Sequence, residues 1–100
     1  MKITLPTGET VWVSWRYETV EEKLVHGKQA KYIEREKTTC IITGEDKQPI
    51  KTVTISRYHT DRSDKETARK ETLRRILADQ DRNIRTIYWN AYKNRNNKNK

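Results

Sequence analysis

The fold of this chain is decided at residues 10–17, which read Thr10-Val11-Trp12-Val13-Ser14-Trp15-Arg16-Tyr17. The odd positions carry only apolar and aromatic side chains, and the even positions are mostly polar. A period of two is typical of a strand in an antiparallel sheet that packs one face on the core and turns the other to water. This stretch therefore predicts a strand with its odd residues inward, and it leaves Trp12 on the polar face.

Turn residues on both sides of this strand separate it from further predicted strands, with which it can form a sheet. Pro6 and Gly8 separate it from a short apolar stretch at residues 3–5, which predicts a first hairpin. Further along, residues 30–43 and 50–57 contain many β-branched side chains and are separated by a polar turn. We expect an antiparallel sheet of about four strands.

Two conformations suit residues 19–29. Thr19 and Glu22 match a capping box at the start of a short helical turn. Alternatively, the second strand continues to Val25 and turns at His26-Gly27-Lys28. We favour the long hairpin, in which the charged run at residues 34–37 of the third strand is either an exposed edge or an arm beyond the core.

After His59 the hydrophobic period becomes helical. Ser63 and Glu66 form a capping box for a first helix, and Asp81 is a candidate cap for a second. Each helix has one apolar stripe, made by Ala68, Leu73, Ile76 and Leu77 in the first and by Ile84, Ile87, Tyr88, Ala91 and Tyr92 in the second. We expect an α+β domain over residues 1–93, with both helices on one face of the sheet, followed by a disordered basic tail at residues 94–100.

Composition excludes several classes of protein. The chain has 100 residues, 32% of them apolar, and no apolar run approaches the ~18 residues of a membrane span. The first six residues have no apolar run, so we expect no secretory signal there. Cys40 is the single cysteine of the sequence, which fits a reducing cytoplasm. Twenty-two Lys and Arg against 14 Asp and Glu give a net charge of +8. Residues 61–100 hold 12 of the Lys and Arg but only 6 of the Asp and Glu. This asymmetry indicates an anionic partner.

Residues suited to catalysis are few. A base, carboxylates and a hydroxyl gather at residues 59–64, but Ser and Asp collect at a strand-to-helix turn for capping in any case. Cys40 lies in an apolar strand, where a buried thiol is inert. His26 and His59 are too few for a zinc site. We expect no enzyme, no bound metal and no cofactor.

The candidate binding residues lie in the predicted helices and at two aromatic positions. The basic helical face comprises Lys65, Arg69, Lys70, Arg74, Arg75, Arg82 and Arg85, and the aromatic anchors are Trp12 and Tyr58. Such a face could pair with phosphates or with an acidic protein surface. Opposite charges four residues apart, as in Glu66 and Lys70, are also the ordinary pattern of a solvated helix. Trp12 is either a contact residue or covered by residues 19–29.

The order of elements over residues 38–92 resembles a known group of proteins. A strand leads through an Asp-containing turn into a helix with the sequence Lys65-Glu66-Thr67-Ala68-Arg69-Lys70-Glu71-Thr72-Leu73-Arg74-Arg75-Ile76-Leu77, and Trp89-Asn90-Ala91-Tyr92 follows. This layout is similar to that of small tailed-bacteriophage accessory proteins. The resemblance implies a non-enzymatic protein in the host cytoplasm that binds and inhibits a host protein or nucleoprotein such as a CRISPR effector or other defence nuclease. The alternative is direct DNA or RNA binding. We expect a monomer or homodimer.

Overall fold

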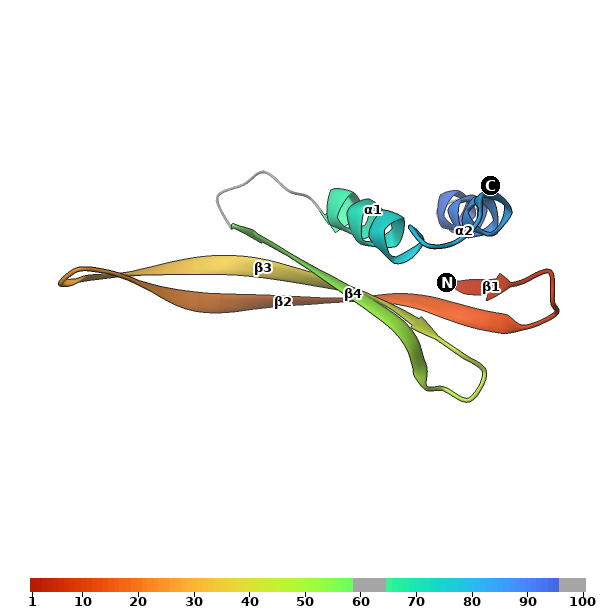
Figure 1. Ribbon diagram of the computed structural model, residues 1–100, viewed down its shortest axis with the longest axis horizontal. Helices are drawn as coiled ribbons and strands as arrows, with labels where there is room; N and C mark the ends of the chain where they lie inside the picture. The colour runs from red at the N-terminus through yellow and green to blue at the C-terminus, as the bar shows by residue number, and fades with distance from the viewer. Residues whose placement is uncertain (59–64, 96–100) are drawn as a thin grey trace.

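The computed structural model describes residues 1–58 and 65–95, except for the side chains of Arg57 and Tyr58. The elements in chain order are β1 (Lys2–Thr4), β2 (Thr10–His26), β3 (Gln29–Thr43), β4 (Pro49–Tyr58), α1 (Lys65–Ile76) and α2 (Arg82–Asn94). The four strands form one antiparallel sheet in the order of the chain (Figure 1). The predicted α+β fold, with two helices after a four-stranded sheet, is confirmed. None of the described helices is long and apolar enough to cross a membrane.

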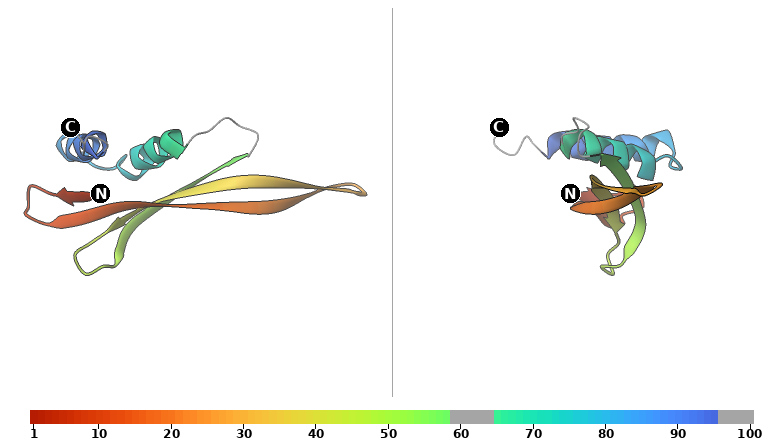
Figure 2. Two further views of the ribbon diagram at one scale, coloured as in Figure 1. Left: turned by 180° about the vertical axis from the view of Figure 1, so that it is seen from behind. Right: turned by 90° about the vertical axis from the view of Figure 1, so that its left-hand side faces the viewer.

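Both helices cover the same face of the sheet, as the end-on view in Figure 2 shows. Helix α1 contacts β3 and β4, and α2 lies beside β1. The core between the layers consists of Ile3, Val11, Val13, Cys40, Ile42, Leu73, Ile76, Leu77, Tyr88 and Tyr92. The inward and outward residues of β2 alternate as predicted, because Val11 and Val13 are buried whereas Trp12 is exposed on the face away from the helices.

Strands β2 and β3 form one long hairpin. Their pairing is continuous from Trp12 opposite Thr43 to His26 opposite Gln29. Gly27 takes a φ of +63° at the first position of the two-residue turn, where a type II′ turn needs a glycine. The long hairpin expected for residues 19–29 is therefore confirmed, and the helical alternative does not form.

The distal half of this hairpin projects beyond the rest of the sheet (Figure 1). The last pair between β3 and β4 joins Arg35 to Tyr58, so residues 21–34 form a two-stranded ribbon, which we call the arm. The molecule measures 58 × 31 × 24 Å and its radius of gyration is 16.8 Å, against about 13 Å for a compact domain of this length. The charged run at residues 34–37 spans the base of the arm.

The helix ends agree in part with the predicted caps. The Asp81 side chain accepts a hydrogen bond of 2.9 Å from the Ile84 N–H, as predicted for a cap of α2. The capping box of α1 cannot be compared, because Ser63 lies outside the described residues.

The helical layer extends past the boundary expected at residue 94. Helix α2 includes Asn94, and the Arg95 guanidinium lies over the rings of Trp15 and Tyr92, 5.7 and 4.4 Å from their centroids. The prediction of disorder at residues 94 and 95 is thus wrong, because these aromatic faces and Glu66 hold the end of the helix. Residues 96–100 lie outside the described part of the chain.

Candidate binding surface

The helical layer carries exposed cations along α1 and on the first turn of α2. Lys70, Arg74 and Arg75 are exposed on α1, and Arg82 and Arg85 are exposed on the first turn of α2. We call these five residues the basic surface. Five residues of chain separate the helices, so the C-terminal end of α1 and the N-terminal end of α2 meet at this turn.

The cations of α1 share a small number of carboxylates. Arg74 and Arg75 both bond Glu71, at 2.7 and 2.9 Å, and Lys70 lies 3.9 Å from Glu66. The hydrogen bonds from Arg74 and then Arg75 hold the pKa of Glu71 below its ordinary value. The two arginines keep 67% and 55% of their side-chain area exposed, so both retain donors that face water. Ion pairs this exposed contribute little to stability.

The two arginines in the first turn of α2 have no such partners in the described part of the chain. Arg82 and Arg85 form no ion pair with any described residue, and α2 has no acidic side chain in its first turn. The nearby acids are engaged elsewhere: Asp81 caps α2, and Asp79 forms an ion pair with Lys51, which lowers the pKa of its carboxyl. Arg82 and Arg85 also occupy the helix end where the dipole disfavours positive charge.

Two of the predicted basic residues face the sheet instead. Arg69 donates to the Tyr17 hydroxyl at 3.0 Å and to Glu66 at 2.7 Å. These hydrogen bonds raise the pKa of its guanidinium above the ordinary value for arginine. The Lys65 ammonium lies 4.9 Å from the centroid of the Tyr17 ring. Both side chains therefore hold α1 against β2, and their contacts with Tyr17 set them apart from the five residues of the basic surface.

Arg95 completes this contact and was not predicted. Its guanidinium reaches Glu66 at 3.3 Å while stacking on Trp15 and Tyr92. Arg69, then Tyr92 and Arg95, keep the pKa of the Glu66 carboxyl below its ordinary value. A lone arginine in an asparagine-rich segment carries no sequence signal for such a role.

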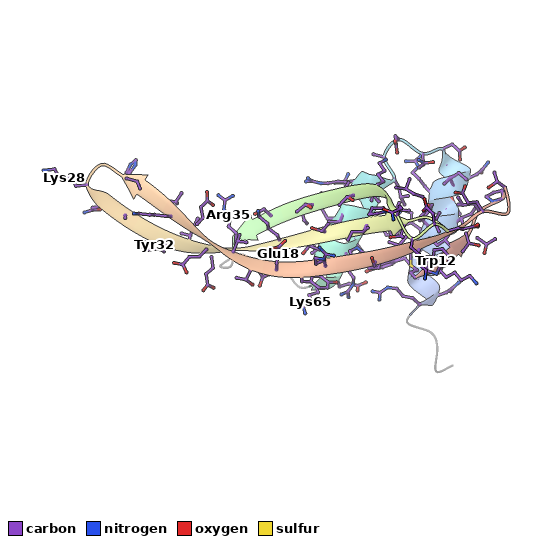
Figure 3. All side chains as sticks on the ribbon, turned by 90° about the horizontal axis from the view of Figure 1, so that it is seen from below. Trp12, Glu18, Lys28, Tyr32, Arg35 and Lys65 are labelled. Atoms are coloured by element: carbon purple, nitrogen blue, oxygen red, sulfur yellow. The ribbon has the colours of Figure 1, made fainter. Side chains whose placement is uncertain are left out.

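Of the two predicted aromatic anchors, Trp12 has a described side chain on the sheet. Trp12 lies opposite Thr43 and Lys2 on the uncovered face of the sheet, and 39% of its surface is exposed. The arm does not fold back over it (Figure 3). The Tyr58 side chain lies outside the described residues, although its backbone ends β4.

Groups suited to catalysis or metal binding do not converge among the described residues. No cluster of three His, Cys, Asp or Glu side chains occurs in this part of the chain. His26 lies at the tip of the arm, whereas Cys40 is fully buried in the core. An open groove of about 590 Å³ lies between β2 and the end of α2, and its lining contains Trp15 and Arg95 but no acid, histidine or cysteine. The segment at residues 59–64, which includes His59, is not described.

The buried thiol leads to a test of the core. Burial raises the pKa of the Cys40 thiol from 9.0 to about 12, against a smaller opposing effect of the hydrogen bond with Thr72. At pH 8 the thiolate fraction is then roughly a thousandfold smaller than in the unfolded chain. We expect native protein to react with iodoacetamide about a thousandfold more slowly than protein in guanidinium, as measured by mass spectrometry. Equal rates would contradict the placement of Cys40.

Comparisons with protein-family models, with curated proteins and with solved structures find no match to this chain.

Proposed function

We propose that this chain is a non-enzymatic binding protein that acts by stoichiometric contact with a host protein or nucleoprotein, through its basic surface. The observation that carries this proposal is the state of Arg82 and Arg85, which are exposed, lack ion pairs with described residues and lie where the helix dipole disfavours them. An anionic partner would compensate both charges.

The arrangement of the acids supports the same contact. The described acids of the helical layer each have a partner within the chain, so their charges are already paired or hydrogen-bonded. These acids are Glu66, Glu71, Asp79 and Asp81. The exposed donors of Arg74 and Arg75 add to the positive field near the turn between the helices. A surface of this sign attracts nucleic-acid backbones and acidic protein surfaces alike.

The phage setting of the proposal rests on the resemblance of residues 38–92 to tailed-bacteriophage accessory proteins. In that setting the partner is a component of host machinery, such as a CRISPR effector or another defence nuclease. The protein would occupy an anionic region of its target, or the nucleic acid that a nucleoprotein holds, and block it without turnover.

The variant Arg82→Glu/Arg85→Glu tests the basic surface. Because acids at a helix N-terminus are stabilising, by about 0.3–1 kcal/mol each, this variant should unfold at the same temperature as the wild type or higher. We expect it to capture at least tenfold less partner from nuclease-treated host lysate in a tagged pull-down. Arg69 is left unchanged because it bonds Tyr17.

A matched control is Lys2→Glu/Arg16→Glu, which changes the net charge equally on the uncovered face of the sheet. This control should retain capture. Capture by Arg82→Glu/Arg85→Glu at the wild-type level would overturn the proposed surface.

Direct nucleic-acid binding through the same residues is the alternative outcome. Phosphate contacts would give duplex DNA binding whose log–log salt slope is about −0.9 per neutralised phosphate. Loss of Arg82 and Arg85 would then reduce the slope by roughly two. Absence of binding to duplex DNA or RNA in low salt would eliminate this alternative.

A further inference from the structure

The arm leaves apolar side chains exposed on a ribbon of only two strands. Leu24, Val25 and Tyr32 keep 41%, 65% and 60% of their surface exposed. Figure 3 shows Tyr32 and Lys28 on the arm, well beyond β4 and the helices. A two-stranded hairpin is marginal in water without a further strand or a packed face. An additional strand along the arm would therefore stabilise it.

The outer edge of β2 offers a place for that element. Met1 and Val13 exchange backbone hydrogen bonds of 2.9 and 2.8 Å, so the odd residues of β2 direct their N–H and C=O groups away from β3. Beyond Val13, no strand in the described part of the chain pairs with this edge. An unpaired edge of this length is a template for another strand.

The sequence along this edge is complementary to itself in the antiparallel direction. When a second copy of β2 is aligned so that Glu22 opposes its own copy, Glu21 lies opposite Lys23 of the second copy and Val20 lies opposite its Leu24. Glu18 then faces His26 of the second copy. Opposite charges and apolar pairs across neighbouring strands are both stabilising.

Neighbouring registers lack this complementarity. A shift by two in one direction places Glu21 opposite Glu21, and a shift in the other places Lys23 opposite Lys23. Like charges directly opposite each other are destabilising. In the favoured register the two Glu22 side chains meet at the axis, but each is bonded to its own Arg35 at 2.7 Å.

The favoured register also fits the length of the free edge. The turn at Gly27 and Lys28 of the second copy would begin opposite Tyr17, so the paired segment ends there and Lys28, which is not part of a strand, lies outside it. Met1, which occupies the edge at Val13, lies beyond this point. The second copy thus covers the unpaired edge without displacing β1.

We propose that the protein forms a symmetric homodimer in which the β2 strands of two copies pair antiparallel around Glu22. The two sheets become continuous, and each arm becomes part of a four-stranded ribbon. The contact lies on the arm, away from the basic surface on α1 and α2, so dimerisation and partner binding are separate properties of the chain.

Charge exchange on the full-length protein tests the pairing by sedimentation equilibrium. Wild type should be a dimer at submillimolar concentration. Glu21→Lys and Lys23→Glu should each weaken self-association roughly tenfold or more, because each places like charges opposite each other twice per dimer. The double variant Glu21→Lys/Lys23→Glu should restore it. A wild-type monomer, or a dimer that neither single variant weakens, would overturn the proposal.

Disulfide formation tests the register independently. Under mild oxidation Glu22→Cys should cross-link into dimers, because opposed residues of an antiparallel pair are close enough for a disulfide. Glu18→Cys is the matched control and should stay uncrosslinked, since its two copies lie at opposite ends of the paired segment. Faster cross-linking of Glu18→Cys would contradict the register.

Discussion

Replacing Leu73 with alanine is expected to lower the free energy of unfolding by about 2–5 kcal/mol. Leu73 is fully buried in α1, within the cluster that joins both helices to the sheet. Removing its branched end leaves a cavity in this cluster, because the surrounding side chains relax into it only in part. A domain of this size has only about 5–15 kcal/mol of stability, so the loss is a large part of the total. Thermal unfolding followed by circular dichroism should show a midpoint lower by about 4–8 °C per kcal/mol.

Lys70→Ala is the matched control on the same helix. Its side chain is exposed, and its one ion pair with a described residue joins it to Glu66 at 3.9 Å. We expect its stability to lie within about 0.5 kcal/mol of the wild type. Equal stability of Leu73→Ala and Lys70→Ala would contradict the packing of α1 on the sheet.

Trp15→Ala should cost about 3 kcal/mol, near the lower end of the range for a buried tryptophan, because Trp15 is only partly buried. Its indole N–H donates to the Thr72 hydroxyl at 3.2 Å, and its ring packs edge-on against Tyr92 at 5.9 Å. The Arg95 guanidinium covers the same ring. The Trp15 side chain on β2 therefore contacts residues from α1, from α2 and from the segment that follows α2.

Two further variants separate the contributions of Trp15. Trp15→Phe keeps an aromatic ring but removes the N–H that Thr72 accepts, so we expect an intermediate loss in denaturant unfolding. Trp12→Ala, three residues away on the opposite face, should lose less than about 1 kcal/mol. A larger loss for Trp12→Ala than for Trp15→Ala would reverse the assignment of the two faces.

Local patterns predict most of the sheet and both helices. The alternation at Val11, Trp12 and Val13 identifies the buried face correctly, and Asp81 marks the start of α2. Residues 19–22 are the ambiguous segment, because Thr19 and Glu22 satisfy a helical capping pattern as well as a strand. The choice is made by β3, whose residues pair with every position of this segment. Such pairing is tertiary and has no local signal.

The basic residues are predictable as a group but not in their orientation. Arg69 lies on the same helix as Lys70, yet it turns toward Tyr17, which is 52 residues distant in the chain. Long cationic side chains can reach either water or a neighbouring aromatic ring at little cost. Helical spacing alone cannot distinguish these outcomes, and for the same reason the role of Arg95 is visible only in the folded chain.

The sequential order of the strands has a consequence for how the chain folds. Each strand pairs with the one that follows it, so every contact within the sheet can form by closing successive hairpins, beginning at the turn of Gly27. Helices α1 and α2 come last in the chain and find their docking face already assembled. Loop closure costs least for such neighbouring pairs, so the topology favours rapid zipping of the sheet followed by helix docking.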